Sequence, residues 1–295
     1  MSPVPTISIV TPSFNQANYI EETLRSVSSQ KCPVLEHLVI DGASTDGTVD
    51  ILKRYSALPE WKYLRWISET DRGQSDAINK GFRMARGDIV GWLNSDDLYV
   101  PDCFSIVSQI FAQNEDVDLV YGDYLIIDKT GRTLILKKEI AFDWDIMLCG
   151  MNYIAQPNVF FRRRVFEAIG YLNNSLHYLM DYEFWLRAAS KGLRFQHIPT
   201  AFAACRWHLD AKTVSQNPEI EKELHSVRDM YWDKKRFRNA GLQTTYERYC
   251  NVRARVARQW RKLRTRHAMD LIPASWYLEA WKTQQRALRK GVSPG

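Results

Sequence analysis

Two adjacent aspartates, Asp96 and Asp97, follow a strongly apolar segment in the stretch IVGWLNSDDLYVP (residues 89–101). Like charges this close repel each other, so we expect a positive group to lie beside them for part of the time. Mg²⁺ is typically held by one or two carboxylates together with the phosphates of a ligand, and Mn²⁺ prefers the same oxygens. One hypothesis is therefore a divalent cation that joins these carboxylates to a phosphorylated ligand. The alternative is a solvated loop in which an aspartate caps a helix.

Similar polar clusters follow three other apolar segments, at residues 11–15 (TPSFN), 41–48 (DGASTDGT) and 69–76 (ETDRGQSD). Taken alone, DGASTDGT is equally well explained as a turn that leads into a helix. It does not match a calcium loop, because Ala43 and Thr45 stand where oxygen ligands are required. The chain has neither a G-x-G-x-x-G motif nor a P-loop motif, which excludes the dinucleotide and P-loop classes of site.

The segments that must position these clusters alternate between strand and helix patterns over the first hundred residues. The predicted strands are residues 6–12, 35–41, 62–68 and 88–94, and the predicted helices between them are 20–30, 48–58 and 74–84. Strands separated by such helices imply right-handed crossovers and a mainly parallel sheet. Ligands of these sheets bind beyond the carboxyl ends of the strands, where all four polar clusters fall. The sequence therefore predicts an α/β domain with a ligand cleft at one edge of its sheet.

After Pro101 the pattern becomes a mixture of helices and antiparallel strands. We expect a helix at 102–114, a hairpin at 119–138 with Gly131 in its turn, a strand at 157–163, helices at 163–169 and 181–192, and a strand at 201–208. This part is predicted to complete the same domain, which then covers residues 1–217.

The charge of the chain is distributed unevenly. Residues 1–217 contain 22 Lys and Arg against 26 Asp and Glu, whereas residues 218–295 contain 18 against 8, so the net charge of +6 comes from the last quarter. The sequence shows no signal peptide and no apolar run near the ~20 residues of a membrane-spanning helix. Its 5 cysteines are scattered and form no C-x-x-C pair, which favours free thiols in a reducing compartment. We therefore expect a cytoplasmic protein.

Five motifs resemble, in order and spacing, those of the family 2 inverting glycosyltransferases. They are TPSFN, VIDGASTDGT, DRGQSDAINKG, NSDDLYVP and MDYEFWLR, and the similarity covers about residues 6–216. It is greatest to bacterial enzymes of surface-polysaccharide assembly. The resemblance implies a GT-A fold, a Rossmann-like α/β domain that binds a nucleoside diphosphate sugar, expected to be a UDP-sugar, with Mg²⁺ or Mn²⁺. It also implies hexosyl transfer with inversion to a saccharide or lipid-linked saccharide acceptor.

The resemblance assigns a set of residues to the donor and its metal. Those expected to contact the donor are Thr11, Pro12, Phe14, Asn15, Asp41, Ser44, Asp46, Arg72, Asn79, Asn94, Asp96, Gln156 and Lys212. Asp41 would accept a hydrogen bond from the uracil N–H, and Lys212 would lie on a loop over the phosphates. The expected metal ligands are Asp97, Asp96 and His208. Ile78 stands where many relatives carry an arginine, which weakens the case for diphosphate contact by the helix at 74–84.

Asp181, in MDYEFWLR, is expected to be the catalytic base. Relatives commonly have Glu-Asp here, and Met180 replaces that glutamate. A carboxylate at a helix N-terminus has a fixed orientation, which suits a positioned base. The alternative explanation for Asp181 is a helix start in which the carboxylate lies near the positive end of the helix dipole. Glu183 would face another side of the helix and is the poorer candidate.

Two other classes of protein share some of these features. A nucleotidyltransferase would normally have a glycine-rich, basic loop near its N-terminus, and TPSFNQANY has neither glycine nor positive charge. A non-catalytic nucleotide-sugar-binding protein would keep the pocket without a working base. Metal-dependent hydrolysis of the donor in the absence of acceptor distinguishes an enzyme from such a protein.

Residues 218–295 are predicted to form a basic helical extension. Apolar residues recur at helical spacing among its arginines, and Trp276, Tyr277 and Trp281 follow Pro273; the recurring residues are Tyr249, Val252, Val256, Trp260 and Leu263. A basic amphipathic helix followed by aromatic side chains is typical of a segment on a membrane surface, here residues 245–290 at the anionic inner face of the plasma membrane. A helix that packs back on the domain is equally compatible with the pattern. No nucleic-acid partner is expected, because no recognition module is present.

Overall fold

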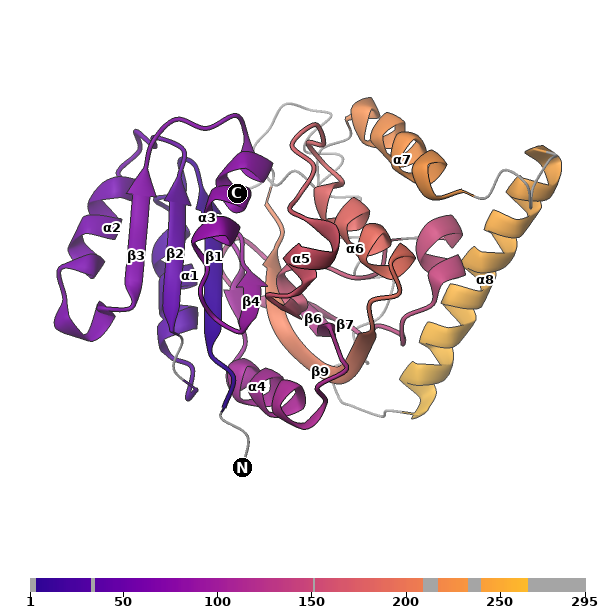
Figure 1. Ribbon diagram of the computed structural model, residues 1–295, viewed down its shortest axis with the longest axis horizontal. Helices are drawn as coiled ribbons and strands as arrows, with labels where there is room; N and C mark the ends of the chain where they lie inside the picture. The colour runs from indigo at the N-terminus through magenta and orange to yellow at the C-terminus, as the bar shows by residue number, and fades with distance from the viewer. Residues whose placement is uncertain (1–3, 33–34, 151, 209–216, 233–239, 265–295) are drawn as a thin grey trace.

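The computed structural model describes residues 4–32, 35–150, 152–208, 217–232 and 240–264 of the chain. These residues build one curved, nine-stranded sheet in the order β3-β2-β1-β4-β8-β6-β9-β5, with β7 paired to β6 (Figure 1). Helices cover both faces of the sheet, as the alternation of side chains along each strand requires. The predicted α/β class is confirmed.

The N-terminal half of the sheet is parallel and follows the predicted alternation. Its strands are β1 (Ile7–Ser13), β2 (Glu36–Asp41), β3 (Leu64–Ser68) and β4 (Ile89–Trp92), and the helices between them are α1 (Ile20–Ser28), α2 (Thr48–Ser56) and α3 (Gln74–Met84), with a short 3₁₀ helix η1 (Pro59–Trp61) before β3. Every residue of β1, β2 and β4 is buried. α3 packs on one face of these strands, and α1, α2 and the later α4 (Cys103–Gln113) pack on the other.

The second half of the sheet is mixed. Its strands are β5 (Leu98–Tyr99), β6 (Leu119–Ile127), β7 (Thr133–Lys137), β8 (Val159–Arg162) and β9 (Phe195–Arg206). β8 joins the two halves, because it lies antiparallel to both β4 and β6. The other elements of this half are the π-helix η2 (Ile146–Gly150), the 3₁₀ helix η3 (Gln156–Asn158), α5 (Val165–Ile169) and α6 (Met180–Ser190). The predicted hairpin at 119–138 is confirmed, with Gly131 at a φ of 84° in its turn.

The sequence patterns missed β5 and the first half of β9. β5 is two residues long, and its partners are Ala203 and Ala204 on β9, about a hundred residues away, so no local signal marks it. The prediction for β9 began at Ala201 because Pro199 and neighbouring polar residues interrupt the strand pattern. The register of β6 against β9 shifts between Tyr121 and Tyr124, which accommodates that interruption.

The basic extension packs on the sheet domain over the part of it that is described. α7 (Pro218–Tyr231) and α8 (Ala240–Arg264) follow the domain, and α8 lies against η2. Figure 1 shows α8 at the end of the molecule opposite α2 and β3. No helix in the described ranges is long and apolar enough to cross a membrane. The domain division at residue 217 stays a prediction.

Three arginines of α8 pair with acidic residues of the sheet domain. A nitrogen of Arg253 lies 2.5 Å from Asp143 Oδ2, one of Arg258 lies 2.6 Å from Glu139 Oε2, and one of Arg261 lies 2.5 Å from Asp123 Oδ2. Arg261 makes a second bond of 2.6 Å to Asp123 Oδ1 and so holds this carboxylate through both oxygens. Asp123 is buried, so water has little access to this ion pair. Loss of Asp123 would therefore leave the Arg261 guanidinium without a carboxylate partner and poorly solvated.

We expect Asp123→Ala to lower the free energy of unfolding by about 3–5 kcal/mol, the cost of breaking a buried ion pair from one side. Urea denaturation followed by circular dichroism measures this change. As a control, Asp50→Ala removes an exposed partner of Lys53, 3.6 Å away, and should cost less than about 1 kcal/mol. Equal losses in the two variants would contradict the idea that the Asp123–Arg261 pair anchors α8.

Candidate active site

The polar clusters after β1, β2 and β3 converge at one edge of the sheet. Gly42, directly after β2, shows how closely they approach. A Cβ atom on this glycine would lie 2.7 Å from Asp71 Oδ2 and 3.3 Å from Phe14 Cδ2. The chain segments that follow three neighbouring strands are therefore in contact, as the parallel sheet predicts.

A network of short hydrogen bonds fixes the Asp41 carboxylate at the end of β2. Ser44 donates to it from its backbone N–H at 2.9 Å and from its hydroxyl at 2.5 Å, and the Ser68 hydroxyl donates at 2.6 Å. The Ser44 hydroxyl oxygen also accepts from the Asn15 N–H at 2.7 Å, which ties the loops after β1 and β2 together. Asp41 itself is fully buried. Ser44 thus orients the Asp41 carboxylate, which is predicted to bind the uracil of the donor.

Asn15 and Asp46 connect the same two loops. The Asn15 side-chain oxygen accepts from the Thr45 N–H at 3.0 Å, and Asp46 accepts from the N–H groups of Ala17 at 2.9 Å and Thr48 at 3.1 Å. Burial raises the pKa of Asp46, but the hydrogen bonds from Thr48 and Ala17 outweigh it and hold the pKa below its usual range. These side chains therefore organise the loop that carries Phe14, a residue that is 61% exposed.

Thr11 and Pro12 are residues of β1 within the sheet. Both residues are buried, and the Thr11 hydroxyl lies 2.9 Å from Nε2 of the buried His37. Burial lowers the pKa of His37 to about 3, so this imidazole is neutral. Because the Thr11 side chain is engaged within the sheet, we do not assign it a direct contact with the donor.

Arg72 and Asn79 have different environments. The Arg72 side chain is exposed, and its guanidinium lies 3.3 Å from Asp76 Oδ1. Asn79 is buried, and its amide donates to Leu172 O at 2.9 Å and to Asn174 Oδ1 at 2.7 Å, while its oxygen accepts from the Leu172 N–H at 2.9 Å. Asn79 therefore holds the segment before α6 in place, and the structure does not support the predicted donor contact by this side chain.

The two carboxylates after β4 are held in different ways. Asp97 is buried, and its Oδ1 accepts from the Arg206 N–H at 2.8 Å. Burial and the neighbouring Asp96 raise the pKa of Asp97 well above its usual range, against the effect of the Arg206 hydrogen bond. Asp96 Oδ2 lies 2.9 Å from Nε2 of His208, which follows β9. The fold thus brings together the three residues that were predicted as metal ligands.

Arg206 is a residue of this site that the sequence analysis missed. Its side chain is fully buried, and its guanidinium bonds to Asp96 O at 2.9 Å, Lys129 O at 3.0 Å and Glu22 Oε2 at 2.6 Å. It therefore fixes the loop that carries the two aspartates. The only signal in the sequence was its position two residues before His208.

Asn94 and Gln156 line the end of β4. The Asn94 oxygen accepts from Trp92 Nε1 and from Gln74 Nε2, each at 3.0 Å, and its amide lies 3.4 Å from Asp97 Oδ2. Gln156, at the start of η3, donates to Trp92 O. Lys212 lies outside the described residues.

The donor set beside β4 fits a hard divalent cation that a ligand helps to bind. In the described part of the chain no three His, Cys, Asp or Glu side chains form a ready metal cluster. In this conformation His208 is bonded to Asp96 and does not complete one. Two adjacent carboxylates, one of them buried, do offer the oxygen ligands that Mg²⁺ or Mn²⁺ combines with phosphate oxygens.

Asp181 is the second residue of α6, and its Oδ1 accepts from the Tyr182 N–H at 2.7 Å. Burial raises the pKa of this carboxyl to about 6, although hydrogen bonds from Tyr182 and Asn152 lower it in part. The Tyr182 hydroxyl donates to Met147 O at 2.8 Å, which anchors this turn in the core. A carboxylate with a pKa near neutrality and a fixed orientation is suited to accept a proton.

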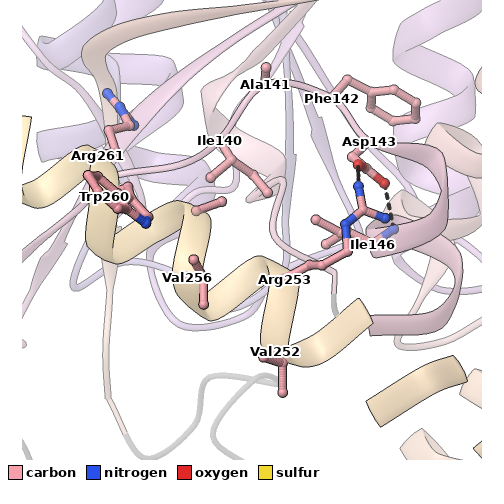
Figure 2. A pocket seen from close by; sticks show the side chains of 11 residues that line it. Ile140, Ala141, Phe142, Asp143, Ile146, Val252, Arg253, Val256, Trp260 and Arg261 are labelled. Carbon is pink, nitrogen blue, oxygen red and sulfur yellow. Dashed lines mark hydrogen bonds and ion pairs between the residues drawn. The ribbon is translucent and has the colours of Figure 1, made fainter. Parts of the chain in front are cut away.

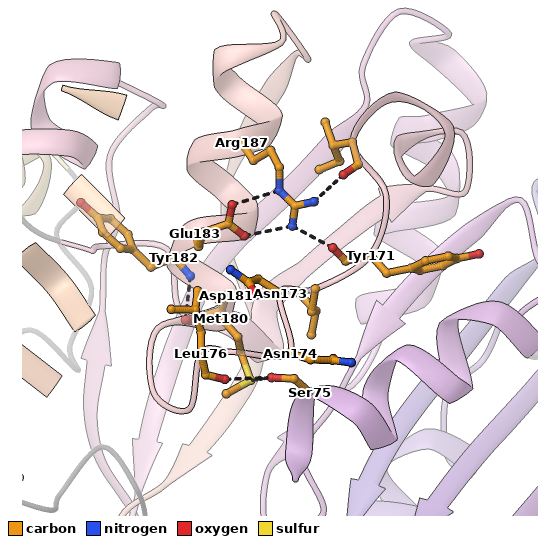
Figure 3. A network of polar contacts seen from close by, with 12 residues as sticks. Ser75, Tyr171, Asn173, Asn174, Leu176, Met180, Asp181, Tyr182, Glu183 and Arg187 are labelled. Carbon is orange, nitrogen blue, oxygen red and sulfur yellow. Dashed lines mark hydrogen bonds and ion pairs between the residues drawn. The ribbon is translucent and has the colours of Figure 1, made fainter. Parts of the chain in front are cut away.

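Glu183 takes no part in this arrangement. Figure 3 shows its carboxylate directed at Arg187, with bonds of 3.0 Å and 2.9 Å, and the Tyr231 hydroxyl donates to it at 2.7 Å. Ser75 on α3 donates to Leu176 O at 3.1 Å in the same region and so helps to hold the segment before Asp181. The expectation that Glu183 faces another side of the helix is confirmed.

Comparison with known proteins identifies the family to which the chain is similar. The sequence model described as glycosyl transferase family 2 matches residues 8–170. A PGL/p-HBAD biosynthesis glycosyltransferase of Mycobacterium bovis is 33% identical over 202 residues, which are 67% of this chain and 76% of the relative. Chondroitin synthase of Escherichia coli is 28% identical over 227 residues, which are 75% of this chain and 32% of the synthase.

A solved structure shows the same fold. The crystal structure of S. aureus TarS 1-349 in complex with UDP-GlcNAc superposes with a TM-score of 0.61 at 19% identity, over 84% of this chain and 71% of that chain. The GT-A architecture that the resemblance implied is confirmed by this likeness.

Proposed function

This chain belongs to glycosyl transferase family 2 and is a glycosyltransferase, and from that premise we propose that it transfers a sugar, with inversion, from a UDP-sugar to a saccharide or lipid-linked saccharide in surface-polysaccharide synthesis. The observation that carries the proposal is that the loops of Phe14 and Asp41 meet at one edge of the sheet. At the same edge, Asp96 and Asp97 follow β4. A nucleoside and a cation-bound diphosphate need these two kinds of surface side by side. The UDP-GlcNAc complex of TarS supports the choice of a UDP-sugar.

The donor would be held by the residues at the strand ends. Phe14 is exposed and can pack on the ribose or base, while the immobilised Asp41 carboxylate can accept from the uracil N–H. A nucleobase without this N–H group would leave the buried Asp41 carboxylate with one hydrogen bond fewer, which is the physical basis of selectivity for uracil. The exposed Arg72 guanidinium is available to phosphate oxygens.

Asp97 and Asp96 are the residues that would hold Mg²⁺ or Mn²⁺ together with the diphosphate. When bound, the cation offsets the negative charge that develops on the departing UDP. Arg206 supports the arrangement because it fixes both the backbone of Asp96 and the carboxylate of Asp97.

Asp181 would act as the catalytic base. It removes the proton from the acceptor hydroxyl while that oxygen forms a bond to the anomeric carbon, and the bond from that carbon to the UDP oxygen breaks on the opposite face. A single displacement inverts the anomeric configuration, in parallel with inverting glycoside hydrolysis. We further propose that the protein works at the cytoplasmic face of the plasma membrane, where a lipid-linked acceptor would be available.

Thermal stabilisation by nucleotide sugars tests the donor site. A ligand that binds only the native state stabilises it by about 2.7 kcal/mol at a concentration of 100 Kd, so a UDP-sugar with Mn²⁺ should raise the melting temperature by several degrees. EDTA should abolish the shift. The control is the matching GDP-sugar, which should give a smaller shift if Asp41 selects uracil.

Hydrolysis of the same donor without acceptor then separates the possible classes of protein. A glycosyltransferase should release free UDP and sugar slowly in the presence of metal. A protein that binds the nucleotide sugar without catalysis gives the thermal shift but no release. The absence of any metal-dependent shift with all nucleotide sugars would refute the donor site.

A further inference from the structure

α8 has two distinct faces. Cys250 and Ala254 are fully buried against the sheet domain. On the outward face, four large apolar side chains follow one another at spacings of three or four residues and remain about half exposed: Tyr249 at 55%, Val252 at 56%, Val256 at 47% and Trp260 at 61%. Residues at these spacings share one side of a helix. The outward face of α8 is therefore a continuous apolar stripe in contact with solvent.

Five arginines of α8 whose side chains the structure describes divide between the two faces. Arg253, Arg258 and Arg261 point toward the sheet domain and pair with its acidic residues, and Figure 2 shows the first of these pairs with Asp143. Arg248 and Arg255 are exposed beside the apolar stripe. Glu247, which is only partly exposed, is the one acidic residue between Ala240 and Arg264. The outward face is thus apolar and positively charged.

The apolar stripe continues into a cavity. A cavity of about 790 Å³ lies between α8 and the segment at residues 140–146 (Figure 2). Val252, Val256 and Trp260 line it from α8, and Ile140 and Ile146 line it from the domain. The same side chains therefore form both the exposed stripe and one wall of this cavity.

We propose that the outward face of α8, formed by Arg248, Tyr249, Val252, Arg255, Val256 and Trp260, rests on an anionic lipid bilayer, and that the adjoining cavity receives apolar lipid groups. Apolar side chains of an interfacial helix enter the boundary between headgroups and acyl chains, where Trp and Tyr are favoured. The two exposed arginines complement the negative surface of the leaflet. A second copy of the chain fits less well, because two such faces would bring only positive charges together.

The bilayer contact would bring the enzyme to a lipid-linked acceptor, and only this purpose of the contact rests on the proposed function. The contact itself does not involve the donor site. Binding to vesicles and hydrolysis of the donor can therefore be measured independently on the same preparation.

Vesicle flotation of the full chain tests the proposal. We expect binding to vesicles of phosphatidylcholine with 30% phosphatidylglycerol, weaker binding to phosphatidylcholine alone, and a decrease with salt. The double variant Arg248→Gln/Arg255→Gln should lower the partition coefficient for anionic vesicles roughly 30-fold. Val256→Asp/Trp260→Asp should lower it at least about as much. The matched control Arg25→Gln/Arg54→Gln removes two exposed arginines next to Glu21 on the other side of the molecule and should bind like the parent.

Hydrolysis of the donor in the absence of vesicles should be unchanged in all of these variants. Any contribution of residues 265–295 is common to parent and variants, so the comparison isolates α8. Parental vesicle binding by both α8 variants, or equal losses in the control, would overturn the proposal. The proposal would also be overturned if the parent were a dimer that binds no vesicles and the α8 variants were monomers. The outward face of α8 would then contact a second copy of the chain. If the parent binds vesicles, the α8 variants bind them more weakly, and no donor is hydrolysed, the result supports the bilayer contact of α8 and refutes the proposed function.

Discussion

Asp181→Asn is expected to lower the turnover number by about 10²–10⁴-fold, the usual contribution of a positioned general base. The amide has the shape of the carboxylate and can still accept from the Tyr182 N–H, so the start of α6 should remain intact. The affinity for UDP and metal should change by no more than a few fold, because Asp181 is assigned to the acceptor. Steady-state transfer and calorimetric titration with UDP and Mn²⁺ measure the two quantities. Turnover like that of the parent would refute the role of Asp181.

The pH dependence of transfer gives a second measure of the same role. Burial raises the pKa of Asp181 to about 6, and only the ionised carboxylate accepts a proton. The rate should therefore be constant above this pH and fall about tenfold per pH unit below it. The matched control is Glu167→Gln, which removes an exposed carboxylate on α5 and should leave both the rate and this profile unchanged.

Asp97→Asn should abolish the part of UDP binding that depends on metal, with a loss of at least about 100-fold. Replacing even a residue that only supports a metal ligand typically costs 10–100-fold in affinity, and Asp97 is proposed to bind the cation itself. The same variant should melt at a higher temperature than the parent when no metal is present. Asp97 is buried beside Asp96, so its charge is unfavourable until a cation arrives.

The opposite signs of these two effects make the test specific. A variant that merely misfolds loses both binding and stability, whereas the loss of a metal ligand lowers binding and raises stability. Asp102→Asn is the control, because Asp102 is partly exposed and has a left-handed backbone with φ of 65° that asparagine tolerates. If Asp97→Asn binds UDP with Mn²⁺ as tightly as the parent, the proposed cation site is wrong.

The first half of the fold was predictable because its information is local. Each strand from β1 to β4 is a short apolar run that ends at polar residues. In each helix between them, apolar residues recur every three or four positions. The right-handed crossover then places the four polar ends at one edge without any knowledge of distant contacts. Asp41 and the pair Asp96–Asp97 could be located in this way, and the convergence around Gly42 agrees with it.

The distant supports of the site could not be predicted in the same way. Arg206 acts through contacts with Glu22, Asp96 and Lys129, which come from three separate parts of the chain. Asn79 looked like a ligand contact because it lies in a recognisable motif, yet its amide is used by the segment at 172–174. A side chain of a given type can bind a ligand or hold a loop, and only its neighbours in space distinguish these roles.

The sequence by itself determined the alternation of strands and helices, the edge at which polar side chains gather, and the amphipathic character of the C-terminal helix. Only the tertiary structure decided which face of α8 lies against the domain. Helical spacing shows which residues share a side, but the acidic partners Asp123, Glu139 and Asp143 lie more than a hundred residues earlier in the chain. Those partners take three of the arginines inward, and the apolar stripe is left outside because the short side chains of Cys250 and Ala254 allow the closer approach to the domain.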